Sequence, residues 1–170
     1  MSHTKNKVEW CLRKAEKELR QSDTHRGLVK SNSDIEKAKE HLYKAEHYLE
    51  ATIVLKENNF SDISASTVFY AMYHCLLAIA TKFGYESRNQ ECTFALINSL
   101  IEDKKIDFDK DLLDKIALFD IEKSAEQTTI KVREQLQYGT GLSLEDNIYN
   151  NLLQLAKQII SKTKIILEER

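Results

Sequence analysis

The sequence is poor in residues that interrupt helices. It has no proline and only four glycines in 170 residues, which argues against collagen-like chains, turn-rich β architectures and Pro- or Gly-rich linkers. It also lacks a run of about 18 apolar residues, so we expect no transmembrane helix. The first residues are polar and charged, without the apolar stretch that is typical of a signal peptide.

Cysteine is scarce too. Cys11, Cys75 and Cys92 are far apart, odd in number and without a C-x-x-C pair, which gives no support to zinc ribbons or thioredoxin-like redox motifs. We therefore expect three free thiols. Free thiols fit a reducing compartment, so we expect a cytoplasmic protein.

What the chain does contain is typical of a globular domain. Apolar residues make up 42% and charged residues 31%, and the net charge is −2, so the charge balance does not by itself require nucleic acid or a membrane as a partner. Phosphate-binding loops, dinucleotide fingerprints, zincin motifs and nucleophile elbows are all missing from the sequence. Composition therefore indicates a fold class but no function.

Apolar residues recur at helical spacing along almost the whole chain. The expected helices span residues 4–22, 33–57, 61–84, 87–101, 110–120, 121–138 and 143 to the C-terminus. Ser33, Ser87 and Ser143 are the expected N-terminal caps. The pattern predicts an all-α, up-and-down helix bundle over residues 31–170, preceded by a helical extension over residues 1–30.

Two histidines on the helix predicted for residues 33–57 are considered first as metal ligands. His41 and His47 are six residues apart, which does not place them on one helix face, whereas a helical metal pair needs a spacing of three or four. We therefore interpret them as exposed helix residues. No metal site is expected.

Two other segments are unusual for a plain bundle. Tyr70 and His74 are four residues apart on the most apolar helix, so they share a face and need polar partners. They could be a hydrogen-bonded pair in the core or part of a site. Residues 85–93 form a dense polar run that includes Arg88. This run could supply helix caps and a surface turn, or the rim of a binding site.

The same residues carry a family resemblance. Residues 69–74 read FYAMYH, and the stretch from Asp62 to Gly84 resembles the second core helix of the HEPN domain family. Residues 34–57 resemble the first core helix of that family. Residues 133–139 read REQLQYG and resemble the family's R-x-x-A-D-Y-G variant and, more loosely, its R-x(4–6)-H motif. The resemblance covers roughly residues 34–168.

The resemblance implies an all-α bundle of four or five helices that often forms a homodimer. Many HEPN proteins are, or derive from, metal-independent ribonucleases in which an arginine and a histidine face each other across a dimer cleft. Many are toxins whose antitoxin is a small nucleotidyltransferase-like protein, and others are inactive binding modules. No cofactor is implied.

The residues at the expected active site depart from the ribonuclease pattern. Arg133 can place a cation at a phosphate, because its guanidinium matches phosphate oxygens. Where the family motif has histidine, this chain has Gln137 and Tyr138. Glutamine does not titrate, and tyrosine with a usual pKa near 10 is a poor base. If the helices pack together, His74 and Tyr70 could complete a polar pocket that binds a phosphate or a nucleotide.

The sequence therefore predicts a HEPN-like module that binds RNA, a nucleotide or a nucleotidyltransferase-like partner, with catalysis weak or lost. The alternative is a metal-independent ribonuclease of the toxin–antitoxin type. A third interpretation is a protein that only stabilises a partner through a dimer. The candidate catalytic residues are Arg133, Tyr138 and His74, and the candidate ligand-binding residues are Tyr70, Gln137 and Arg88.

Overall fold

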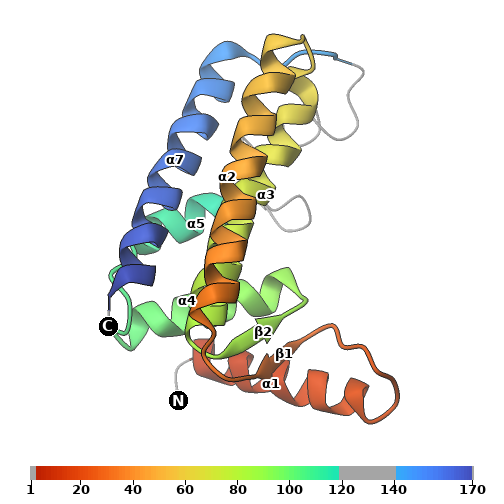
Figure 1. Ribbon diagram of the computed structural model, residues 1–170. Helices are drawn as coiled ribbons and strands as arrows, with labels where there is room; N and C mark the ends of the chain where they lie inside the picture. The colour runs from red at the N-terminus through yellow and green to blue at the C-terminus, as the bar shows by residue number, and fades with distance from the viewer. Residues whose placement is uncertain (1–2, 119–140, 170) are drawn as a thin grey trace.

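The computed structural model describes residues 3–118 and 141–169, which contain six helices and one small sheet (Figure 1). The predicted all-α bundle with an extra N-terminal helix is confirmed. The helices are α1 (His3–Leu19), α2 (Ile35–Glu57), α3 (Ser61–Lys82), α4 (Gln90–Glu102), α5 (Lys110–Leu118) and α7 (Asp146–Glu168). The strands are β1 (Leu28–Lys30) and β2 (Tyr85–Ser87). The helix predicted for residues 121–138 lies outside the described ranges.

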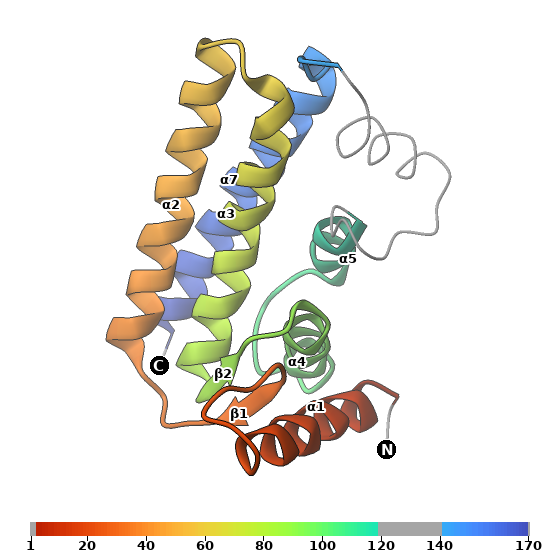
Figure 2. The same cartoon turned by 90° about the vertical axis from the view of Figure 1, so that its right-hand side faces the viewer.

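Helix α3 is the centre of the bundle. It packs against α2, α7, α4 and α5, while α2 and α7 run beside it along most of their length (Figures 1 and 2). Apolar residues occur on most faces of α3, and Val68, Met72, Leu76 and Ile79 are almost fully buried. Its length and mean hydropathy of 1.5 would also suit a membrane span, but 61% of that stretch is buried inside the protein. Burial of this kind is typical of a core helix, so the composition is weak support for a membrane span.

The helix caps differ from those that the sequence predicted. Asp34, not Ser33, caps α2, because its side chain accepts a hydrogen bond from the backbone N–H of Lys37 at 2.9 Å. Asn89, not Ser87, caps α4 by accepting from the N–H of Cys92 at 2.9 Å. Helix α7 begins after Glu145 rather than at Ser143, without a side-chain cap.

A two-stranded antiparallel sheet replaces two predicted features. The segment expected to be a loop forms β1, and the predicted start of the fourth helix forms β2, with Leu28 opposite Ser87 and Lys30 opposite Tyr85. Each strand has only three residues, too few for an alternating pattern to be recognised in the sequence. The sheet joins the segment after α1 to the connection between α3 and α4.

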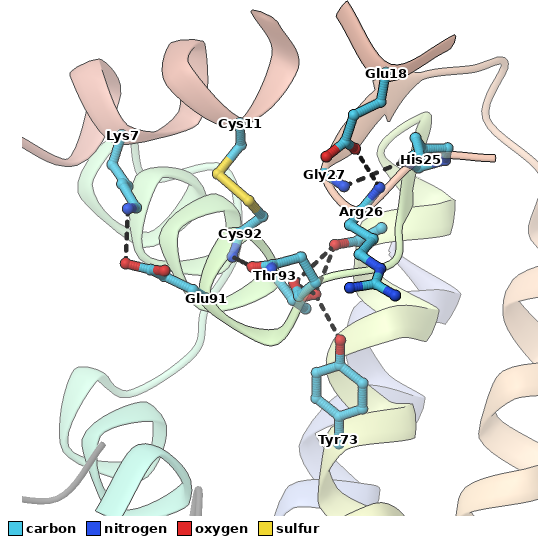
Figure 3. Close-up of a disulfide and its surroundings, with 12 residues drawn as sticks. Lys7, Cys11, Glu18, His25, Arg26, Gly27, Tyr73, Glu91, Cys92 and Thr93 are labelled. Atoms are coloured by element: carbon cyan, nitrogen blue, oxygen red, sulfur yellow. Dashed lines mark hydrogen bonds and ion pairs between the residues drawn. A yellow bond between two sulfur atoms is a disulfide. The ribbon is translucent and has the colours of Figure 1, made fainter. Parts of the chain in front are cut away.

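Helix α1 is fixed to the bundle through α4. Cys11 and Ala15 of α1 are fully buried, and Cys11 forms a disulfide with Cys92 in α4 (Figure 3). The expectation of three free thiols is therefore wrong for this pair, because the fold brings together two cysteines that are 81 residues apart. Cys75 is a buried free thiol. The division of the chain at residue 30 stays a prediction.

Candidate functional site

Four rings from α2 and α3 form one cluster at the boundary between the two helices. His41 and Tyr48 come from α2, and Tyr70 and His74 come from α3. The Nδ1 atoms of His41 and His74 are 3.1 Å apart, and their rings stack with centroids 5.4 Å apart. The ring of Tyr48 is 5.6 Å from both His74 and Tyr70, centroid to centroid. We call these four residues the His–Tyr cluster.

Helical spacing explains how the cluster forms. Tyr70 and His74 are one turn apart on α3, and His41 and Tyr48 are seven residues, or two turns, apart on α2. Both pairs lie where the two helices pack, at the edge of the core rather than inside it. The side chain of Tyr70 is 44% exposed, and the other three rings are half-buried. The cluster therefore offers aromatic surface to a ligand from solvent.

Two sequence interpretations change as a result. His41, interpreted as an ordinary exposed residue, is the direct partner of His74, so that interpretation is wrong. Tyr70 and His74 are not a pair enclosed in the core, because Tyr70 faces solvent and His74 is hydrogen-bonded to His41. The spacing of seven between His41 and Tyr48 was the signal in the sequence that could have identified them. The spacing alone is a weak signal, because it does not show which helix packs against these two residues.

Both imidazoles of the cluster are neutral at pH 7. Burial, with smaller contributions from His41 and Lys44, lowers the pKa of His74 from 6.5 to about 4. Burial, followed by the charges of Lys37 and Lys44, also lowers the pKa of His41. In the bond between the two Nδ1 atoms one ring donates and the other accepts, so at least one of them must be neutral.

Arg88 lies at a cavity next to this cluster. The cavity has a volume of about 620 Å³, and its lining includes Lys37, His41 and Arg88 together with the carboxylates of Asp34, Glu36 and Glu86. Because His41 also belongs to the His–Tyr cluster, the cavity and the cluster are continuous. The guanidinium of Arg88 donates from Nε to the carboxylate of Glu86 at 2.9 Å and stays exposed. The polar run at residues 85–93 therefore supplies a strand, a helix cap and part of a cavity wall.

Arg133, Gln137 and Tyr138 lie outside the described residues. Whether they meet His74 and Tyr70 in one pocket stays a prediction. Among residues 3–118 and 141–169, no group of three or more His, Cys, Asp or Glu side chains is arranged to hold a metal ion. The geometry on which a function can be argued is therefore the His–Tyr cluster and the cavity beside it.

A family model for the HEPN domain matches residues 38–166, about three quarters of the chain. The chain belongs to the HEPN domain family. The matched range of this HEPN protein begins in α2 and ends in α7, so it contains the whole His–Tyr cluster. Helix α1 and strand β1 lie before it. No curated protein matches the sequence.

The family match shows that this protein contains a HEPN-type module. The described residues add a pair of neutral histidines that stacks on Tyr48, which in turn contacts Tyr70, bordered by lysines from α2. The Cys11–Cys92 bond, which the sequence analysis missed, lies elsewhere in the protein, between α1 and α4. With three cysteines in the sequence, the pairing could not be deduced without the fold.

Proposed function

We propose that this HEPN domain binds RNA or a nucleotide at the His–Tyr cluster, with catalysis weak or lost. The observation that carries the proposal is the set of stacked, partly exposed rings at the boundary of α2 and α3. Exposed aromatic rings stack on nucleobases, typically with about 1–3 kcal/mol per base. Stacking of this kind needs no metal and tolerates every base.

Positive charge borders the cluster on the side of α2. Lys37 and Lys44 are close enough to His41 to lower its pKa, and both lysine side chains are exposed. Arg88 is a third exposed cation at the adjoining cavity, where its guanidinium is paired with Glu86. Phosphate groups of a ligand stacked on the rings would find these cations within reach, which supports a nucleic acid or a nucleotide over an uncharged ligand.

The electrostatics favour binding over cleavage. Metal-independent RNA cleavage needs a base for the 2′-hydroxyl and an acid for the leaving oxygen, both with pKa values near the working pH. With a pKa lowered by burial to about 4, His74 is almost never protonated at pH 7 and is a weak base. Gln137 and Tyr138 replace the histidine of the family motif, so the second catalytic group is also missing.

The alternative is a metal-independent ribonuclease that uses Arg133 with His74 or Tyr138. The hydrogen bond between His41 and His74 favours it, because a proton held between two imidazoles could pass to a leaving group.

We also propose, as the resemblance implied, that the protein forms a homodimer and that a nucleotidyltransferase-like antitoxin is a candidate partner. A purely partner-stabilising protein would use none of these rings.

A binding titration tests the proposal. Fluorescence anisotropy with a labelled short single-stranded RNA should show binding by the wild type and about tenfold weaker binding by Tyr70→Ala. The matched control is Tyr43→Ala, because Tyr43 is 73% exposed on α2 and makes no ring contact with the cluster. Equal loss in both variants, or no binding by the wild type at high concentration, would contradict the proposal.

A cleavage assay tests the alternative that the protein is a metal-independent ribonuclease. The same RNA is incubated with the wild type and with Arg133→Ala in EDTA, and the products are separated on a denaturing gel. We expect intact RNA with both proteins. Cleavage by the wild type that disappears in Arg133→Ala would establish the ribonuclease instead.

A further inference from the structure

The disulfide joins two helices that pack side by side, with contacts along α4 from Glu91 to Asp103. Cys11 lies in the middle of α1, and Cys92 is the third residue of α4. Figure 3 shows the bond bridging the two helices, with the Lys7–Glu91 ion pair beside it. Both sulfur-bearing residues are fully buried, so a reagent in solution reaches the bond only when α1 opens locally.

The other contacts of α1 with α4 are non-covalent, and they include hydrogen bonds from Thr4 to Glu102 and from Asn98 to Thr4. Its fully buried side chains are small, namely Cys11 and Ala15, and Val8 and Leu12 are only partly buried against the core. The ion pairs from Lys5 to Asp103 and from Lys7 to Glu91 lie at the surface, where such pairs contribute little. Isolated helices of this length are marginal in water. The disulfide is therefore the covalent link of α1 to α4, and it adds to these packing and surface contacts.

We propose that Cys11 and Cys92 are a reversible redox-modification site, at which thiol–disulfide exchange with a low-molecular-weight disulfide locks α1 onto α4 and reduction releases it. A disulfide that bridges two separate helices, at positions 81 residues apart, has the arrangement such a switch needs. The proposal does not depend on the ligand of the His–Tyr cluster.

The exchange proceeds in two balanced steps. With α1 released, the thiolate of Cys92 attacks a small disulfide, forms a mixed disulfide and expels one small thiolate. The thiolate of Cys11 then attacks the Cys92 sulfur, forms the Cys11–Cys92 bond and expels the second small thiolate. Two electrons pass from the protein to the small disulfide, and the two protein protons end on the two small thiols. Reduction by a small thiol in excess runs the same steps backwards.

The position of Cys92 makes it the first nucleophile. Cys92 is in the first turn of α4, where the positive end of the helix dipole favours a thiolate. Cys75, in contrast, is fully buried in the core, and burial raises the pKa of its thiol to about 12. Cys75 is therefore the inert cysteine of the chain, and it serves as the matched control.

Release of α1 affects the sheet and the cavity as well. Gly27 lies directly against the backbone of Cys11 and Ala15, and its carbonyl accepts a hydrogen bond from the N–H of Arg88 at 3.1 Å. Arg88 lines the cavity beside the His–Tyr cluster. The redox state of the pair therefore acts on a wall of that cavity through the segment between α1 and β1.

Hydrogen exchange on the full-length wild type tests the proposal without any substitution. The protein is equilibrated in oxidised or in reduced glutathione, and amide exchange is followed by mass spectrometry. Amides of α1 should exchange at least about tenfold faster in the reduced protein, while amides of α3 should not change. Equal protection of α1 in both states would overturn the proposal.

Trypsin and thiol mapping test the bond itself. Arg20 and Arg26 are exposed between α1 and β1, so cleavage there leaves α1 attached only through the disulfide. The oxidised wild type and Cys75→Ala should keep the α1 fragment on a non-reducing gel, and Cys11→Ser should lose it. Loss of the fragment in oxidised wild type, or a linked peptide that contains Cys75, would contradict the pairing.

Discussion

At the scale of single residues, the pair His41 and His74 is the most informative feature. Each ring supplies the hydrogen-bond partner of the other, and both are held neutral by burial and by nearby lysines. A neutral, stacked pair is suited to holding a base and poorly suited to proton transfer at pH 7. Its electrostatics therefore bear directly on whether the domain binds or cleaves its ligand.

The pair also makes stability depend on pH in a defined direction. The unfolded chain takes up a proton on this histidine as the pH falls below 6.5, whereas burial holds the pKa of His74 in the folded state at about 4. Stability is therefore greatest above pH 6.5 and is lost progressively between pH 6.5 and 4. Because the ring is only partly buried, the loss is about 1–2 kcal/mol.

Replacing His74 by Gln isolates this effect. Glutamine does not titrate, so urea denaturation of His74→Gln at pH 7.5 and pH 5 should show a smaller difference in unfolding free energy than the wild type shows. His47→Gln is the control, because His47 is exposed on the same helix as His41. An unchanged pH difference in His74→Gln would mean that His74 is not held neutral by the fold.

At the scale of elements, the sequence predicted helices well and their first residues less well. Periodicity identified α2, α3 and the last helix because each repeats its apolar stripe over many turns. The caps were displaced because Ser33 stands next to Asp34, and Ser87 stands near Asn89, and any of these residue types can cap a helix. The short strands β1 and β2 had no pattern to detect.

The cap of α2 offers a direct test at this scale. Asp34→Ala removes the acceptor of the Lys37 N–H and should lower the unfolding free energy by about 1 kcal/mol. It should also speed exchange of the Lys37 amide. Ser33→Ala is the comparison, because the hydroxyl of Ser33 donates to the Lys82 carbonyl instead. Faster Lys37 exchange in Ser33→Ala but not in Asp34→Ala would restore Ser33 as the cap.

At the scale of the whole molecule, contacts between distant segments made the features that the sequence could not show. His41 and His74 are 33 residues apart, and Cys11 and Cys92 are 81 residues apart. Local spacing identified Tyr70 and His74 as unusual, but their partner depended on how α2 packs on α3. The sequence therefore predicted the α3 half of the site, Tyr70 and His74, but not the α2 half. The attachment of α1 to α4 could not be predicted from spacing.

Gly27, the residue before β1, fits tightly against α1. A Cβ atom at this position would lie 2.7 Å from the carbonyl oxygen of Cys11 and 2.9 Å from the Cβ of Ala15. A backbone oxygen and a buried methyl group, both of α1, leave little room for adjustment, so a side chain would push α1 away from β1. Only glycine fits between them without such a shift.

Gly27→Ala should therefore lower the unfolding free energy by about 1–3 kcal/mol and speed amide exchange in α1. Thermal denaturation and hydrogen exchange of the oxidised protein measure the two effects. Gly141→Ala is the matched control, because an added Cβ there meets no atom within 4 Å and should change stability by less than about 0.5 kcal/mol. If Gly27→Ala is as stable as Gly141→Ala and protects α1 equally, α1 does not pack on β1 as described. Loss of stability in Gly27→Ala alone would show that the fit of α1 depends on non-covalent packing in addition to the disulfide.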